Sequence, residues 1–189
     1  MAPAASNAPS NAAEAGRRDA VLESALLTFA RHGYRKASME EVARAARISR
    51  PGLYFLFESK EALFRAAVGR ALEEDLAAAE RILADTGRPL PERLIGAFDR
   101  WTGRYLGPLS RDVTGVIEQN PDLLGELTET APARFERLIT DAVAETADHA
   151  KAVRVAQTLI SASIGVKHQV ETREAYLERL AAAVALLVG

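Results

Sequence analysis

The chain has 189 residues, of which 48% are hydrophobic, so it can bury a substantial core as one large domain or two smaller ones. It contains no cysteine, which excludes disulfides, thiolate zinc sites and cysteine nucleophiles and is typical of a reducing compartment. The net charge of −2 conceals an asymmetry, because residues 1 to 70 carry eleven Lys or Arg against seven Asp or Glu (+4), whereas residues 71 to 189 carry thirteen against nineteen (−6). The acidic total therefore excludes no anionic partner for the basic N-terminal part.

Residues 1 to 16 are mainly Ala, Pro, Ser and Asn, and without large apolar side chains we expect a disordered tail. This start lacks the basic and apolar regions of a signal peptide, and no later run approaches the roughly 18 apolar residues of a membrane span. We therefore expect a cytoplasmic protein with no membrane segment. From Arg17 a helix is predicted, since apolar residues recur at every fourth position from Val21 to Phe29, and Gly33 is expected to end it.

Two short helices joined by a tight turn are predicted next. Ser38 and Glu41 stand at capping-box spacing, so a helix begins at about Met39. Ser49 is a good N-cap for a second helix that begins at Arg50 and carries a proline in its first turn. Two short helices separated by about three residues match a helix-turn-helix, in which the second helix enters the DNA major groove.

The remaining chain also has helical periodicity. A long helix capped by Ser59 is predicted over 60–84, broken by Thr86-Gly87-Arg88-Pro89. Further helices are predicted over 91–106, 112–119, a short stretch of 123–130 before Pro132, 135–146, 152–167 and 173–188. No segment shows the period-two alternation of a hairpin. The predicted fold class is all-α with about nine helices: an N-terminal three-helix helix-turn-helix DNA-binding domain over 17–64 and a C-terminal helical domain over 65–189.

Around the two short helices stand several spaced residues: Gly33-Tyr34, Ala37-Ser38, Ile48-Ser49, Gly52-Leu53-Tyr54, Phe57 and Lys60-Glu61-Ala62-Leu63. Over about residues 17 to 65 this combination resembles the N-terminal domain of the tetracycline-repressor (TetR) family of bacterial transcriptional regulators. The resemblance implies a homodimer with one DNA-reading domain per subunit and a helical C-terminal domain that dimerises and holds a small-molecule effector. One departure is Arg47, where the family often has Gly, and a left-handed residue without glycine costs on the order of 1 kcal/mol.

Mapped onto this chain, the resemblance places the helix over 50–55 in the major groove of double-stranded DNA. Arg50 is the strongest base-reading candidate, because a guanidinium can bond O6 and N7 of guanine together; a phosphate contact is the alternative. For Tyr54 and Lys60 we expect phosphate contacts, with packing as the alternative for Tyr54. Lys36 is either a phosphate contact or a solvated loop lysine. The expected DNA contacts are Lys36, Ser38, Ser49, Arg50, Pro51, Gly52, Tyr54 and Lys60.

The effector site is less clearly marked. An aromatic stripe that includes Trp101 can line an apolar pocket, and ordinary core packing is the alternative. The candidate ligand-binding residues are Phe98, Trp101, Arg104, Tyr105, Gln119 (or its neighbour Glu118) and His168. Glu145 and His149 stand four residues apart, but no second acid and histidine pair supports a metal site, so neither a metal nor a cofactor is expected.

Dimerisation is expected through the last two helices. They combine small residues with large apolar ones, and the final helix is apolar almost all round, so it needs cover on both sides. The residues are Ala152, Ala156, Ser161, Ala162, Ser163, Gly165, Tyr176, Leu177, Leu180, Val184 and Leu187. Two helices from each subunit would form a four-helix bundle; the alternative is a helix buried within one monomer.

The predicted function is that of a ligand-responsive repressor that binds a palindromic operator as a dimer. The alternative is a helical DNA-binding or partner-binding module that senses no small molecule. An all-α enzyme is disfavoured, because the three histidines are scattered and the chain has no glycine-rich phosphate loop and no Gly-x-Ser-x-Gly sequence.

Overall fold

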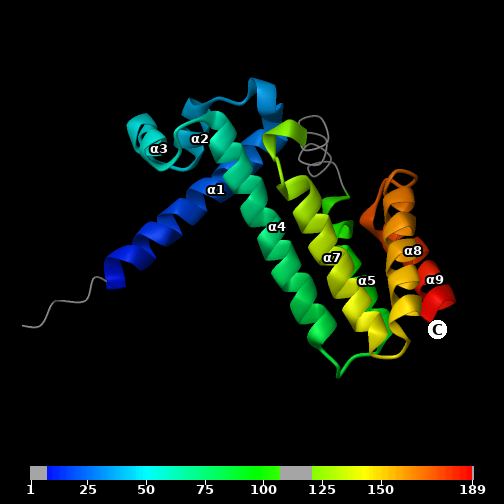
Figure 1. Cartoon of the computed structure of the whole chain (residues 1–189). Coiled ribbons are helices and arrows are strands. Elements are labelled where there is room, and N and C mark those ends of the chain that lie inside the picture. The colour runs from blue at the N-terminus through cyan, green and yellow to red at the C-terminus, as the bar shows by residue number, and fades with distance from the viewer. Residues whose placement is uncertain (1–7, 107–120, 189) are drawn as a thin grey trace, which may run out of the picture. The chain divides into compact units, whose positions relative to one another are not determined.

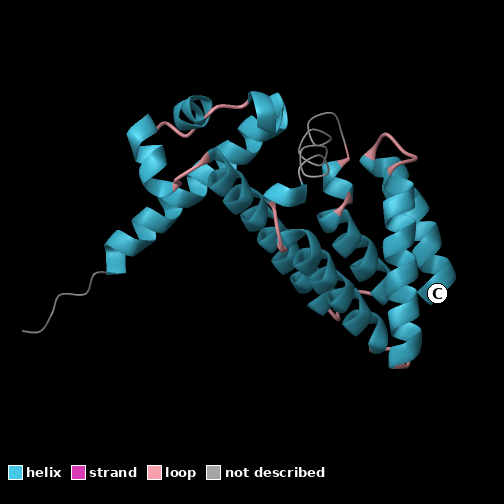
Figure 2. Ribbon diagram, turned by 45° about the horizontal axis from the view of Figure 1, so that its top comes forward, coloured by secondary structure: helices cyan, strands magenta, loops and turns pink. Residues whose placement is uncertain are grey.

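The computed structural model of the chain describes residues 8–106 and 121–188. Within these ranges the chain forms eight α-helices and two short 3-10 helices, with no strand (Figures 1 and 2). The all-α fold class predicted from the sequence is confirmed. The chain divides into two compact units, unit 1 over Met1–Arg70 and unit 2 over Ala71–Gly189, so the division falls inside the fourth helix.

Unit 1 is built from three helices and the beginning of a fourth. They are α1 (Ala8–Lys36), α2 (Met39–Ala45), α3 (Arg50–Leu56) and the first residues of α4 (Lys60–Ala84). Helix α2 packs on α1 and on α3. Phe29 and Phe64 are both fully buried, and their rings meet edge to face with centroids 5.2 Å apart. These two rings pack α1 against the start of α4.

The first helix differs from the prediction at both ends. It begins at Ala8, ahead of the predicted Arg17, so part of the expected tail is helical. Alanine has the highest helix propensity, and the run before Arg17 is rich in it. Near the other end, Gly33 has φ 73° and interrupts the helix, as the sequence predicted, although helical turns resume as far as Lys36.

Unit 2 is a bundle built from the rest of α4 and the C-terminal helices. These are α5 (Leu90–Trp101), the 3-10 turns η1 (Gly103–Tyr105) and η2 (Pro121–Leu123), α7 (Leu127–Ala144), α8 (His149–Lys167) and α9 (Arg173–Val188). Helix α8 packs between α7 and α9, and α9 also packs on α5. The largest buried side chains include Phe98, Phe135 and Tyr176. No helix in the described part of the chain is long and apolar enough to cross a lipid bilayer.

Two predicted helix ends in unit 2 are wrong. The helix expected to reach residue 106 stops at Trp101, because the chain tightens at Gly103, where a Cβ would lie 3.3 Å from the Tyr176 ring. Pro132 does not end a helix; it lies inside α7, where buried Ala131 and Phe135 keep the helix packed on the bundle. The helix predicted over 112–119 lies outside the described residues.

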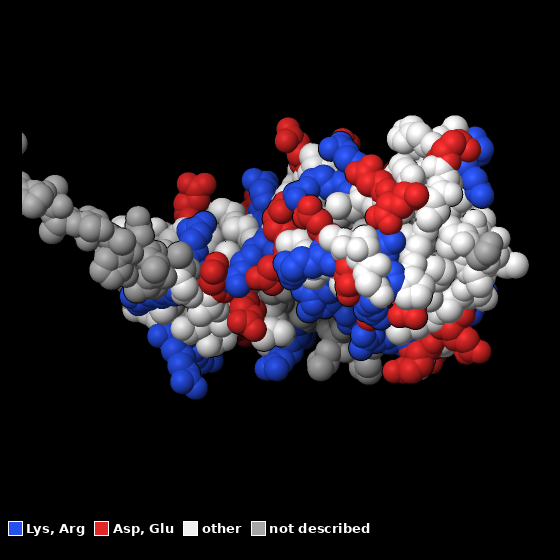
Figure 3. Space-filling view, turned by 90° about the horizontal axis from the view of Figure 1, so that it is seen from below, with Lys and Arg blue, Asp and Glu red and all other residues white. Residues whose placement is uncertain are grey.

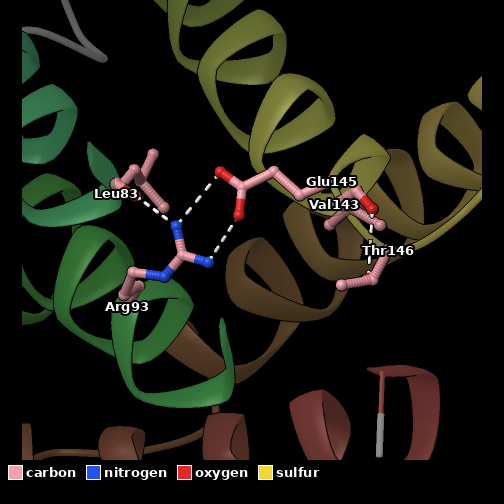
Figure 4. A network of polar contacts seen from close by, with 5 residues as sticks. All are labelled: Leu83, Arg93, Val143, Glu145 and Thr146. Carbon is pink, nitrogen blue, oxygen red and sulfur yellow. Dashed lines mark hydrogen bonds and ion pairs between the residues drawn. The ribbon is translucent and has the colours of Figure 1, made fainter. Parts of the chain in front are cut away.

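The ends of three helices in unit 2 meet at one buried arginine. Arg93 of α5 is 4% exposed and donates to the carbonyl oxygen of Leu83 near the end of α4 (Figure 4). Its guanidinium also donates twice to Glu145, which follows α7, at 3.1 and 2.6 Å. These hydrogen bonds lower the pKa of Glu145 and raise that of Arg93. Arg93 thus donates a hydrogen bond to a carbonyl near the end of α4 and forms a salt bridge with the residue that follows α7.

Candidate nucleic-acid interface

The start of α2 is closed by a complete capping box. The Ser38 amide donates to Glu41 at 2.8 Å, and the Glu41 amide donates to the Ser38 hydroxyl at 3.2 Å. Hydrogen bonds from Ser38 lower the pKa of Glu41, which keeps the carboxylate charged. The predicted capping box is confirmed. Ser38 is an expected DNA contact, but its exposed side chain already caps the start of α2.

The turn between α2 and α3 passes through a left-handed residue. Arg47 has φ 55°, the only positive φ among the described non-glycine residues. The Arg47 amide donates to Arg44 and the Ile48 amide to Ala43, so both close the end of α2. The left-handed residue that the family resemblance implied at Arg47 is present, and this exposed arginine takes the strain that a glycine would avoid.

Helix α3 begins with a serine cap. The Ser49 hydroxyl accepts a hydrogen bond from the Gly52 amide at 3.1 Å, and a Cβ on Gly52 would lie only 3.0 Å from that hydroxyl oxygen. Glycine therefore suits both the cap and a close approach of another molecule. Pro51 stands in the first turn, where the missing amide costs no helical hydrogen bond. The predicted start of α3 is confirmed.

The two faces of α3 are clearly different. Leu53 is fully buried and the following Phe57 is 4% exposed, so one face is fixed in the unit 1 core. The outward face carries exposed Arg50 and Pro51, together with Tyr54 at 42% and Phe55 at 86% exposure. The Arg50 guanidinium carbon lies 5.8 Å from the centre of the Tyr54 ring, and no ion pair holds Arg50 among the described residues. These side chains are free to meet a partner.

Sequence reasoning missed Phe55, which was absent from the expected DNA contacts. The signal was present in the spacing: Leu53 and Phe57 form the apolar pair that faces the core, so a residue midway between them points the other way.

Lys60 is placed differently from its predicted role as a phosphate clamp. Its ammonium donates to the carbonyl oxygens of Tyr34 at 2.8 Å, Ala37 at 3.1 Å and Arg35 at 3.4 Å. It also lies 4.5 Å from the centre of the Tyr34 ring. Because an ammonium has three donors, these carbonyls occupy Lys60 fully. Its role in the structure is to join the end of α1 to the start of α4.

A basic residue of α1 that was not among the predicted site residues holds the end of α3. The Arg18 guanidinium, from α1, donates to the carbonyl oxygen of Leu56 at 3.2 Å and lies 4.3 Å from the centre of the Phe57 ring. It therefore fixes the last turn of α3 from outside that helix. Lys36, at the end of α1, is exposed, and its position remains compatible with the predicted phosphate contact.

Charge alone does not locate the interface. On the face drawn in Figure 3, blue basic groups and red acidic groups are interspersed. Helix α3 is an exception in the sequence, since Arg50 is its only charged residue. An anionic partner would therefore meet no carboxylate from α3 itself.

The candidate effector residues in unit 2 mostly make internal contacts. Phe98 is buried edge to face against Phe135, and Trp101 stacks on the same ring with centroids 4.8 Å apart and planes 9° apart. For these two residues the structure matches the alternative of core packing. His168 is exposed just after α8, and Glu118 and Gln119 lie outside the described residues. No group of acids and histidines in the described ranges is arranged to hold a metal.

Tyr105 and Arg104 belong to a polar network around a buried aspartate. Asp75 of α4 is 1% exposed and accepts hydrogen bonds from the Tyr105 hydroxyl and from Arg104 at 2.7 Å, and it pairs with Arg100 at 2.8 Å. Burial raises the pKa of Asp75, opposed by these three donors. Burial and the neighbouring carboxylate also raise the pKa of Tyr105. The network ties α4 to α5 and η1 within unit 2.

Several of the expected dimer residues belong to the core of the subunit, and the most exposed apolar residues on the same two helices were not among those expected. Ala152, Ala156, Ser163, Tyr176, Leu180 and Val184 are buried within the subunit. The Ser163 and Tyr176 hydroxyl oxygens lie 2.7 Å apart and form a hydrogen bond inside that core. On the outside, Ile164 of α8 is 55% exposed and Leu186 of α9 is 87% exposed. The two helices therefore serve the monomer core and still leave apolar groups on their outer faces.

Comparison with known families gives one match, over residues 21–67, to a model described as "Bacterial regulatory proteins, tetR family". A similar protein is the HTH-type transcriptional repressor ComR of Escherichia coli K12, 39% identical over 56 residues. That match covers 30% of this chain and only 27% of the repressor's length. The family match lies on the helix-turn-helix region, within unit 1.

Solved structures extend the likeness to the whole fold. A putative TetR-family transcriptional regulator from Mesorhizobium loti has a TM-score of 0.74 at 18% identity, over 92% of this chain and 95% of that one. The reduced form of Escherichia coli NemR also has a TM-score of 0.74, at 16% identity, over 92% and 97% of the two chains. At these identities the likeness establishes the fold alone.

Proposed function

We propose that the chain is a sequence-specific, DNA-binding transcriptional regulator of the TetR type, because residues 21–67 match the model of that family and the fold resembles that of a solved TetR-family regulator. The observation that carries the proposal is the outward face of α3. This helix is capped at Ser49, anchored in the core by Leu53, and presents Arg50 and Tyr54 without an acidic neighbour on the same helix. Such a helix can enter the major groove, where Arg50 would bond a guanine and Tyr54 a phosphate.

We propose that the protein acts as a homodimer on a palindromic operator, with two copies of α3 about one DNA turn, roughly 34 Å, apart. Exposed Ile164 and Leu186 support dimerisation through α8 and α9, since a second copy would cover both. Repression is the expected outcome, because occupying a promoter requires no contact with further proteins. The similarity of a 56-residue stretch to the transcriptional repressor ComR supports the same direction.

We also propose that a small-molecule effector controls DNA binding. Helix α4 contributes its first residues, from Lys60, to unit 1 and its later residues, including buried Asp75 and Leu76, to unit 2. A ligand that binds unit 2 differently in two states would therefore act on the helix that begins beside the DNA-reading motif. Only such a difference in affinity can change operator binding.

A module that binds DNA without sensing is the second candidate function, and one observation favours it. Trp101 and Phe98 pack on Phe135, and Tyr105 is tied to Asp75, so these candidate effector residues already have internal partners. Operator affinity measured with and without a ligand that is known to bind would separate the two functions. A sensor changes its operator affinity on binding the ligand, whereas a non-sensing module does not.

The first experiment is fluorescence anisotropy with the DNA upstream of the protein's own gene and a scrambled fragment of equal length. Both are titrated at about 50 mM and 200 mM salt. The Arg50→Ala, Tyr54→Ala double variant is compared with Arg81→Ala, which removes one exposed positive charge from unit 2. We expect the wild type and Arg81→Ala to prefer the upstream fragment, and the double variant to lose that preference.

Equal and weak binding of the wild type to both fragments would contradict self-regulation, and a genome-wide selection of bound fragments would then be needed to find an operator. Failure of that selection would contradict the proposed function itself. The proposed dimer is tested by sedimentation of an Ile164→Glu, Leu186→Glu variant, which we expect to be monomeric. A dimer that survives both charges would place the subunit interface elsewhere.

A further inference from the structure

The outward face of α3 is unusual in its chemistry for a surface that is expected to read DNA. Phe55 is 86% exposed and Tyr54 is 42% exposed, side by side in sequence, and Pro51 is one turn before Phe55. A phenyl ring has neither a hydrogen-bond donor nor an acceptor. Arg50 is the one side chain of α3 with several donors, so hydrogen bonds from this helix can specify few base pairs.

We propose that Phe55 is a specificity-determining residue that contacts the C5-methyl group of a thymine in the major groove. This inference rests on the proposed function, since it assumes that α3 enters that groove. The thymine methyl is the one apolar group that base edges present there, and phenylalanine is among the side chains that recognise it by apolar contact. The Phe55 ring, which is exposed to water in the free protein, is then buried in the complex.

The position of Phe55 on α3 predicts where that thymine stands. Arg50 and Phe55 are five residues apart, about 7.5 Å along a helix that rises 1.5 Å per residue. Successive bases along a strand are about 3.4 Å apart. With α3 lying along the groove, the thymine should be about two base pairs from the base that Arg50 contacts.

The backbone that carries Phe55 is fixed by its neighbours, as recognition of a single methyl group requires. The next residue, Leu56, gives its carbonyl oxygen to the Arg18 guanidinium at 3.2 Å, and Arg18 also lies 4.3 Å from the centre of the Phe57 ring. Phe57 is 4% exposed and anchors the end of α3 in the core. The backbone around Phe55 is thus fixed from two sides.

The test replaces the thymines of an identified operator one at a time by deoxyuridine, which pairs identically and lacks only the methyl group. Anisotropy titrations compare the wild type with Phe55→Ala, with Phe55→Leu, and with Leu27→Ala as a control. Leu27 is an exposed apolar residue of unit 1, 62% accessible and on α1, so its loss should not alter operator affinity.

We expect one thymine per half-site at which deoxyuridine weakens wild-type binding about fourfold, the factor for one methyl-sized group. At that position Phe55→Ala should bind thymine and deoxyuridine DNA equally, while Phe55→Leu retains part of the difference. Binding of Phe55→Ala to scrambled DNA, and its salt dependence, should equal those of the wild type.

The proposal is overturned by three results. The first is a wild type insensitive to every deoxyuridine replacement, and the second is a Phe55→Ala variant that keeps the wild-type penalty. The third is loss of scrambled-DNA binding by Phe55→Ala, which would assign the ring a general rather than a sequence-reading role. None of these coincides with failure of the proposed function, in which the wild type itself would prefer no DNA sequence.

Discussion

The two units use their polar and aromatic residues in opposite ways. In unit 1, Arg50 and Tyr54 are exposed, and within the described part of the chain the Arg50 guanidinium has no charge or ring contact besides the Tyr54 ring. In unit 2, Trp101 stacks on Phe135, and Tyr105 donates its hydroxyl to buried Asp75. Arg50, Tyr54, Trp101 and Tyr105 are all candidate binding groups in the sequence. Their contacts in the folded chain separate a group available to a partner from one that holds the fold.

This contrast has an energetic basis. A buried polar group without a partner costs free energy, so the interior of unit 2 supplies donors for Asp75 from Arg100, Arg104 and Tyr105. An exposed arginine is satisfied by water until a ligand replaces it. A binding surface can therefore be identified by polar groups that the fold leaves without a protein partner. Arg50 on the outward face of α3 is such a group.

The largest effect is expected from breaking the unit 2 network. Asp75→Ala would leave Arg100, Arg104 and Tyr105 without their common acceptor, and we expect unit 2 to lose about 3–5 kcal/mol of stability. Urea unfolding followed by Trp101 fluorescence measures this, because the single tryptophan of the chain lies in unit 2.

The matched control is Glu73→Ala, two residues earlier on α4. Its ion pair with Arg134 is exposed on both sides, so we expect a loss of about 0–1 kcal/mol. If Asp75→Ala cost as little as Glu73→Ala, the network would not be holding the bundle, and its two arginines and tyrosine would become candidates for ligand binding.

The sequence predicted unit 1 more fully than unit 2, for a physical reason. Its helix starts at Met39 and Arg50 are set by serine caps within three residues, and such signals are local. In unit 2 the end of α5 depends on Gly103 packing on Tyr176, and Pro132 is accommodated by buried neighbours in α7. These contacts join residues far apart in the sequence or depend on packing of the whole bundle, and periodicity does not reveal them.

The candidate site followed the same division. The family resemblance indicated Arg50 and Tyr54 as outward-facing groups, whereas the hydrogen bonds of Lys60 to the carbonyls of Tyr34 and Ala37 depend on the path of α1 after Gly33. A lysine at a helix start is suited to a phosphate, and only the folded chain identifies acceptors that compete for it.

Lys60→Met sharpens the comparison within unit 1. Removing the ammonium leaves the carbonyls of Tyr34 and Ala37 without their donor, and we expect a loss of about 2 kcal/mol in the stability of unit 1. Thermal unfolding by circular dichroism measures it. At temperatures where the variant is folded, the salt slope of DNA binding should be unchanged; a slope lower by about 1, with normal stability, would restore the phosphate-clamp role.

A smaller, pH-dependent effect is expected at the Arg93 network. Glu145→Gln keeps the shape of the side chain and removes its charge, and we expect a loss of about 1.5 kcal/mol near neutral pH, because Glu145 is partly solvated. The Arg93 hydrogen bonds lower the pKa of Glu145 in the folded state. The stabilisation is therefore present above the ordinary glutamate value of 4.5 and is lost as pH falls through the lower, folded-state pKa.

Urea unfolding of both proteins by Trp101 fluorescence, at neutral pH and at successive values below 4.5, measures this difference. The two stabilities should converge as the pH falls. A difference that stayed constant with pH would mean that the charge on Glu145 contributes nothing and that only its hydrogen-bond geometry matters.

The smallest effect tests a strained residue just before α3, the proposed DNA-reading helix. Arg47 has φ 55°, where a side chain costs about 1 kcal/mol that glycine avoids. Arg47→Gly should therefore be more stable than Arg47→Ala by about 1 kcal/mol, reduced by the greater freedom of glycine in the unfolded chain. The comparison between the two variants cancels the loss of the arginine charge.

Thermal unfolding measures the difference, and in DNA titrations both variants should lose the same affinity relative to the wild type. If only Arg47→Gly lost sequence preference while remaining the more stable, the strained turn would be setting the orientation of α3 toward DNA, and the strain at Arg47 would belong to recognition.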